Sequence, residues 1–193
     1  MKSVFKPVLM LSLVATVLAG CAQLSPQQIA FEPVVSPDSL PAGNGRTFWV
    51  DVEDGRSSTV IGQRGGVYEN SSAITASGDL RKQLQDQVVG ALEVAGFEAV
   101  EMNADFEWTV TLEELSYELN DIDAARKEAK VAAEVSVEIV KANSSYANSF
   151  RSQRSAEFFR YPDEQENEEM LTETFDAAIE RMFNDAGLNR FLR

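Results

Sequence analysis

The sequence predicts an α+β domain, a two-layer sandwich in which two helices pack on one face of a mostly antiparallel sheet. Two segments, near residues 79–95 and 164–186, repeat apolar residues every three or four positions, as amphipathic helices do. Several other segments alternate apolar and polar residues, as half-buried strands do. The chain has 193 residues, 44% of them hydrophobic, which suffices for one core, so we expect a single domain over residues 46–193.

The first 20 residues have the features of a secretory signal peptide. Lys2 and Lys6 form a short positive region, and the mostly apolar run 7–20 is too short to span a bilayer as a helix. The run ends in Leu18-Ala19-Gly20-Cys21, which resembles the lipobox of bacterial lipoproteins. This resemblance implies cleavage after residue 20, lipidation of Cys21 and attachment to a membrane through that lipid.

Residues 21–45 are expected to form the lipidated cysteine and a flexible tether. The segment is rich in Gln, Ser, Ala and Gly, and four prolines prevent a helix: Pro26, Pro33, Pro37 and Pro41. Alternatively, its apolar pieces Ile29-Ala30-Phe31 and Val34-Val35 dock on the domain as an edge strand.

The folded domain is expected to begin with a strand near Arg46. Phe48, Val50 and Val52 follow the period of two that a strand requires, and Asp54-Gly55 then marks a turn. Residues 56–78 are rich in Gly and Ser and predict a loop or a weak hairpin, with extended pieces near residues 59–61 and 73–76.

Both predicted helices have recognisable ends. Ser77 or Asp79 can cap the first helix, and Gly96 can take the left-handed conformation past its end. The second helix covers residues 164–186 and is expected to stop at Gly187. Its first turns are acidic, which the partial positive charge of a helix N-terminus favours without any ligand.

A short strand at residues 97–100 precedes three long strands that should form an antiparallel meander. Their apolar positions alternate with polar ones over residues 106–112, 131–139 and 146–158. In the first long strand the alternation changes phase before Leu115, and a β-bulge near Glu113-Glu114 explains the change. One face of the sheet is expected to be polar.

Composition argues against several classes of function. The chain has no His and a net charge of -14, which disfavours nucleic-acid binding and removes the commonest general base and metal ligand. Asp121 and Asp123 lack the Gly and the terminal Glu of a calcium loop. We therefore expect no catalytic residues, no metal site, no cofactor and no enzymatic activity.

The order of motifs is similar to that of the YajG family of uncharacterised bacterial lipoproteins. The features that carry this resemblance are the lipobox at Cys21, Asp54-Gly55-Arg56, Ile61-Gly62-Gln63-Arg64, and a helix with Leu80 and Leu84 that ends in Gly96-Phe97. The resemblance covers nearly the whole chain and implies a lipoprotein that faces the periplasm. It implies no activity and no catalytic residues.

Asp54, Arg56 and Arg64 are the first candidate binding residues. An acid at a strand end and two arginines beside a Gly-rich loop can form an ion-pair cluster or an anion site. The simpler interpretation is a turn aspartate with two exposed arginines.

Aromatic residues out of phase with the apolar positions are the second candidates. Trp49, Phe159 and Tyr161 would mark a contact surface if they were exposed. Otherwise they would form a second core layer under the tether or under the loop 56–78.

The basic residues of the third long strand and its end are expected to pair within the sheet. Arg151, Arg154 and Arg160 can reach Glu134 and Glu138 across the meander. Such pairing would leave no basic ligand site.

Together these features predict a non-enzymatic lipoprotein that binds another component of the cell envelope, most plausibly a protein, through an exposed sheet edge or the polar sheet face. The alternative is a module that binds a small ligand or a cell-wall fragment through Arg56, Arg64 and the loop 56–78. Ala22 is not the aspartate that retains enterobacterial lipoproteins in the inner membrane, so the outer membrane is the expected location.

Overall fold

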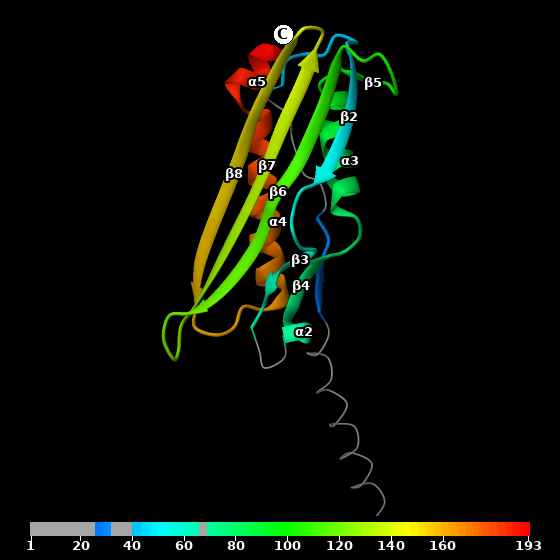
Figure 1. Cartoon of the computed structure of the whole chain (residues 1–193). Coiled ribbons are helices and arrows are strands. Elements are labelled where there is room, and N and C mark those ends of the chain that lie inside the picture. The colour runs from blue at the N-terminus through cyan, green and yellow to red at the C-terminus, as the bar shows by residue number, and fades with distance from the viewer. Residues whose placement is uncertain (1–25, 32–39, 66–68) are drawn as a thin grey trace, which may run out of the picture.

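The computed structural model describes residues 26–31, 40–65 and 69–193, and the structural statements below concern these residues. The expected signal peptide, Cys21 and Val34-Val35 lie outside them. The elements in chain order (Figure 1) are β1 (Gln27–Ile29), β2 (Thr47–Asp54), β3 (Val60–Gln63), α2 (Glu69–Ser72), β4 (Ala73–Ala76), α3 (Leu80–Val94), β5 (Glu98–Ala99), β6 (Phe106–Asp121), β7 (Lys127–Lys141), β8 (Ser144–Phe158), α4 (Glu164–Phe183) and α5 (Ala186–Phe191).

The described strands form one mixed sheet in the order β1-β4-β3-β6-β2-β5, with β7 paired to β6 and β8 paired to β7. Four pairings are parallel and three are antiparallel, so the prediction of a mostly antiparallel sheet is wrong. Alternation shows which side of a strand is buried, but not the direction of its neighbour. The chain passes through α3 between β2 and β6, and this crossover returns it to the end where β2 began, so the two strands run parallel.

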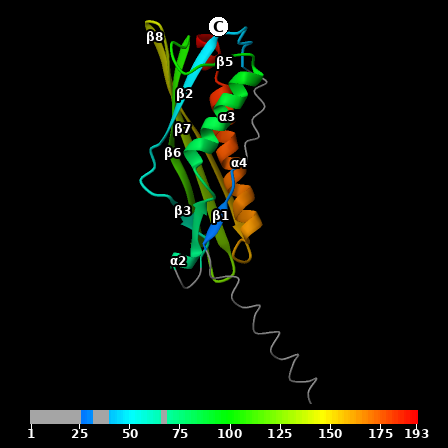
Figure 2. The same ribbon diagram turned by 90° about the vertical axis from the view of Figure 1, so that its right-hand side faces the viewer.

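The long helices lie on one side of the long strands. α4 packs against β7 and β8, and α3 packs against β2. Figure 1 shows both helices behind the long strands, and Figure 2, turned by 90°, shows them on the same side of the sheet. We call the opposite side of β2, β6, β7 and β8 the outer face, and no described helix covers it.

The antiparallel meander of β6, β7 and β8 and its bulge are confirmed. β7 pairs antiparallel with both neighbours, and the register against β6 shifts between Leu112 and Glu114. Leu112 and Leu115 are both buried, although they are three positions apart. The extra residue therefore keeps the apolar side of β6 on the core across the change of phase.

The ends of the first helix are as predicted, and the end of the second is not. The Asp79 carboxylate caps α3, and Gly96 follows it with a φ of 85°. α4 ends at Phe183 and not at residue 186. Asp185 starts the separate helix α5 by accepting a hydrogen bond from the Leu188 amide, so Gly187 lies inside a helix and does not stop one.

Part of the expected tether belongs to the sheet. Gln27, Gln28 and Ile29 form β1, which pairs in parallel with β4, and Ile29 and Phe31 are buried. This is the docked arrangement that we considered as the alternative, and the folded part therefore begins before residue 46. Period-two patterns are weak over three residues, so the partner strand β4 could not be identified from the sequence.

Candidate functional site

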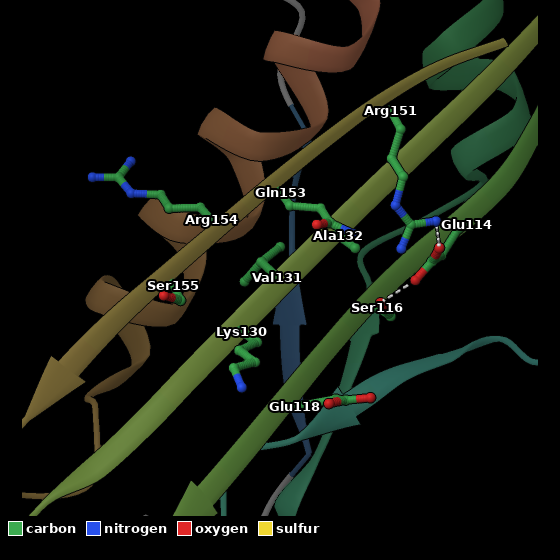
Figure 3. Close-up of a pocket in the computed structure, with 10 residues that line it drawn as sticks. All are labelled: Glu114, Ser116, Glu118, Lys130, Val131, Ala132, Arg151, Gln153, Arg154 and Ser155. Carbon is green, nitrogen blue, oxygen red and sulfur yellow. Dashed lines mark hydrogen bonds and ion pairs between the residues drawn. The ribbon is translucent and has the colours of Figure 1, made fainter.

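The outer face carries rows of polar side chains that run across the meander. One row is Glu114, Glu134 and Arg151, which lie directly opposite one another on β6, β7 and β8. Beside it lies a hollow of about 420 Å³. Figure 3 shows the side chains around it, which are Glu114, Ser116, Glu118, Lys130, Val131, Ala132, Arg151, Gln153, Arg154 and Ser155.

Arg151 is held by two carboxylates of this row. Its Nη1 lies 2.9 Å from Glu134 Oε2 and also pairs with Glu114, and the hydroxyl of Ser116 donates to Glu114. These carboxylates raise the pKa of the Arg151 guanidinium. The predicted pairing of Arg151 with Glu134 is confirmed. Arg151 and Glu114, which line the hollow, are already paired with each other.

The other two arginines of the predicted basic stripe do not join this row. Arg154 pairs with Glu173 on α4, and in Figure 3 it points away from Arg151 and Glu114. Arg160 pairs with Glu166 at 2.6 Å. The prediction that these arginines pair with Glu138 is wrong, because neither side chain lies on the outer face of β8 beside that residue.

Asp54 and Arg56 form a two-pronged ion pair. Nε and Nη2 of Arg56 each lie 2.8 Å from a carboxylate oxygen of Asp54, and this pairing lowers the pKa of Asp54. The Arg56 side chain is only 7% exposed, which the simpler interpretation did not predict. Its buried Nη1 has no hydrogen-bond partner among the described residues.

The side chain of Arg64 does not pair with Asp54 but with another carboxylate. It pairs with Glu164 at the start of α4 and donates to the Ser71 carbonyl oxygen at 3.3 Å. Arg56 and Arg64 therefore have different carboxylate partners among the described residues, Asp54 and Glu164, so the structure does not show the predicted cluster of Asp54 with both arginines.

The three aromatic candidates are exposed, but they lie at two places. Trp49 is 39% exposed and lies on β2 opposite Glu107, near the start of β6. Phe159 and Tyr161 follow β8, at the other end of the meander, and are 85% and 50% exposed. The interpretation of a second core layer is therefore wrong for Phe159, whereas Tyr161 packs with part of its ring against Gly65 of the loop 56–78.

The longest edge strand among the described residues is β8, since the other two edge strands, β1 and β5, have three and two residues. Among the described residues it pairs with β7 alone, over 15 residues without a register shift. Its sequence contains neither Pro nor Lys, two residues that commonly protect sheet edges. The sequence predicted that an edge would be exposed but did not identify which one.

The half-buried carboxyl group of Asp176, on α4, lies in surroundings that disfavour its negative charge. Burial, together with the nearby Glu180, raises the pKa of Asp176 to about 6. Its Oδ1 has no hydrogen-bond partner among the described residues. At a given pH the neutral carboxyl group of Asp176 is therefore more populated in the folded than in the unfolded protein.

Asp176→Asn should stabilise the protein at pH 8 and leave it unchanged at pH 4. The carboxyl group contributes its stability below its unfolded pKa, and that contribution is lost as the pH rises from about 4 through about 6. Because the side chain is partly solvated, we expect a gain of about 1 kcal/mol at pH 8. Urea unfolding at both pH values measures it. Glu169→Gln, at an exposed position of α4, should show no such difference.

The described residues contain neither a metal-ligand cluster nor a membrane-spanning helix. No group of three or more Asp, Glu, Cys or His side chains that could hold a metal ion occurs in the described ranges. None of the described helices is long and apolar enough to cross a membrane.

Comparison with known proteins relates this chain to lipoproteins. The model of the family Lipoprotein_16, described as uncharacterized lipoprotein, matches residues 33–193. The comparison with curated proteins found no match. Among solved structures, a protein of family DUF330 from Xanthomonas campestris is similar, with 11% identity and a TM-score of 0.50 over 86% of this chain and 93% of that chain.

A minor lipoprotein from Acinetobacter baumannii is also similar, with 10% identity and a TM-score of 0.45 over 75% of this chain and 92% of that chain. At such identities, the likeness to the protein from Xanthomonas campestris concerns the fold alone.

Proposed function

The chain belongs to the Lipoprotein_16 family of uncharacterized lipoproteins, the YajG family, and we propose that it is a non-enzymatic protein-interaction module of the cell envelope. In this proposal Cys21 carries the lipid, the outer membrane is the anchoring membrane, and the domain faces the periplasm. The lipobox at residues 18–21 and Ala22 after the cysteine support this location.

The observation that carries the proposal is the open edge of β8. The backbone carbonyl of Arg151 accepts a hydrogen bond from Nη1 of Arg181 at 2.6 Å, so this carbonyl points away from β7. Backbone groups alternate between the two sides of a strand, and therefore Ala147 and Gln153 also turn their N–H and C=O groups outward. An extended segment of another protein can pair with the outward groups of Ala147 and Gln153, whereas the Arg151 carbonyl is already bonded to Arg181.

The outer face supports the same proposal. Its side chains beside the β8 edge are small or polar, such as Ala147, Ser149 and Gln153, and all three are exposed. A partner strand added at β8 would continue this polar face without burying an unpaired charge, because Arg151 already has its carboxylates.

Ala147→Pro should weaken partner binding at least about tenfold while the domain stays folded. Proline removes one outward N–H group, and at an edge position it removes no bond to β7. Ala147→Thr keeps that N–H group and is the matched control. We expect capture of the partner from detergent-solubilised envelopes to fall at least about tenfold for Ala147→Pro only, as loss of about 1.4 kcal/mol would give.

The thermal midpoints of the two variants verify that both are folded. Equal capture by the proline and threonine variants would exclude strand addition at β8. If the wild-type chain captured no more of any protein than a chain lacking Cys21 does, this result would count against any partner in the envelope.

A second candidate function is the binding of a small ligand or a cell-wall fragment. The observation that favours it is the hollow on the outer face, since Arg56 and Arg64 are occupied by carboxylates. A ligand at 100 times its dissociation constant would stabilise the fold by about 2.7 kcal/mol. Thermal shifts with muropeptides and anionic metabolites test this candidate, and Lys130→Ala should remove any shift that arises at the hollow.

A further inference from the structure

Three segments that are far apart in the sequence meet at one end of the domain, which we call the β1 end. It contains the start of β1, the turn 122–126 after β6, and the loop 159–163 after β8. Lys127 lies opposite Phe158, which brings the turn beside the loop. Nε2 of Gln27 donates to the carbonyl oxygen of Glu164 at 2.6 Å, which brings β1 to the same place (Figures 1 and 2).

The β1 end exposes apolar side chains. Phe159 is 85% exposed, Tyr161 is 50% exposed and Ile122 is 40% exposed. Nζ of Lys127 lies 4.8 Å from the centre of the Tyr161 ring, and Gly65 packs against the edge of the same ring. Tyr161 is therefore held in place, while Phe159 extends into solvent beside it.

The length of chain before β1 limits how far this end can be from a lipid on Cys21. Six Cα-to-Cα steps separate Cys21 from Gln27, and at about 3.6 Å each they span at most about 22 Å. Had residues 22–45 been a tether, the domain could have stood several times farther away. With β1 in the sheet, the β1 end must lie close to the membrane surface.

The charges at this end do not favour anionic lipids. Arg126 pairs with Asp123, Lys127 pairs with Asp121, and Arg160 pairs with Glu166. Each cation thus has a carboxylate partner, so little net positive charge is available to attract lipid headgroups. The attraction to a membrane must come from the apolar and aromatic side chains, which prefer the boundary between headgroups and acyl chains.

We infer that the β1 end rests on the bilayer that holds the lipid anchor, with Phe159 inserted among the headgroups and Tyr161 at the surface. This inference rests on the lipid anchor of the proposed function. It also sets the direction of the domain, because β6 is 16 residues long, ends at the β1 end, and extends from there for about 50 Å back to its first residue. The β8 edge then stands along the membrane normal and is accessible from the side.

Quenching of an added tryptophan by brominated lipids tests this orientation. Lipidated full-length protein is placed in phosphatidylcholine vesicles with brominated acyl chains, as the Phe159→Trp or the Met102→Trp variant. Met102 is 77% exposed and precedes β6, so it is a matched control at the opposite end. The native Trp49 and Trp108 lie near that opposite end and give the same background in both variants.

We expect brominated lipids to quench at least about half of the added fluorescence in Phe159→Trp, and almost none in Met102→Trp. Equal quenching of the two variants, while both float with the vesicles, would overturn the orientation but leave the anchor intact. Failure of the protein to float with the vesicles would overturn the anchor, and the orientation with it. Both positions are exposed, so neither substitution should unfold the domain.

Discussion

Phe31→Ala is expected to lower the free energy of unfolding by about 4 kcal/mol, the usual loss for a buried phenylalanine. Phe31 is 2% exposed, and its ring packs edge-on against Phe175 of α4 with 5.2 Å between the ring centres. Truncation would leave a cavity between the segment after β1 and α4. If Phe31 belonged to a flexible tether, Phe31→Ala would change the free energy of unfolding by less than about 0.5 kcal/mol, because the side chain would already be in solvent.

Urea unfolding followed by far-UV circular dichroism measures this loss. Gln28→Ala is the control, because Gln28 is on β1 but exposed, and it should change the free energy of unfolding little. A double mutant with Phe175→Ala should lose about 1 kcal/mol less than the sum of the single variants, owing to the shared ring contact. An unchanged stability for Phe31→Ala would mean that the chain before residue 46 does not belong to the folded domain.

Gly62→Ala is expected to cost about 3 kcal/mol, at the upper end of the range for overpacked positions. A Cβ atom at Gly62 would lie 2.0 Å from the carbonyl oxygen of Tyr117. This oxygen belongs to the backbone of β6, so it cannot move away as the end of a flexible side chain could. The pairing of Gly62 with Tyr117 joins β3 to β6, and the substitution would push the two strands apart.

Gly90→Ala is the matched control for this prediction. Nothing lies within 4 Å of a Cβ atom at Gly90, which is in the interior of α3. Alanine there should stabilise the protein by about 0.5 to 1 kcal/mol through its higher helix propensity. The same chemical change thus has opposite signs at two glycines, and similar thermal midpoints for the two variants would contradict the close approach of β3 and β6.

Features set by local sequence could be predicted, and features set by distant contacts could not. The change of phase between Leu112 and Leu115 predicted the bulge, because side chains on a strand alternate whatever the neighbouring strand is. The parallel pairing of β2 with β6 depends on the path of the chain through α3. The residues of the two strands do not indicate the direction in which the strands pair. The predicted helix end at Gly187 is wrong, because Asp185 caps a further helix, α5, that contains Gly187.

The same division applies to the polar side chains. The pair Arg151 and Glu134 could be predicted, because both lie on adjacent strands of one hairpin. Arg64 pairs with Glu164 and Arg154 with Glu173, and both contacts join a strand or loop to α4. Only the packing of α4 on the sheet brings these groups together, so spacing in the sequence gave no sign of them.

The most direct test of an interaction module is crosslinking inside cells from the β8 edge. A photoreactive residue is placed at Ala147 or, as control, at Asp86, which is exposed on α3, the helix that packs against β2, and β6 and β7 separate β2 from β8. We expect a discrete adduct with another envelope protein from position 147, and none from position 86. No adduct from position 147, or adducts with further copies of this chain only, would contradict the proposal that β8 binds a protein partner.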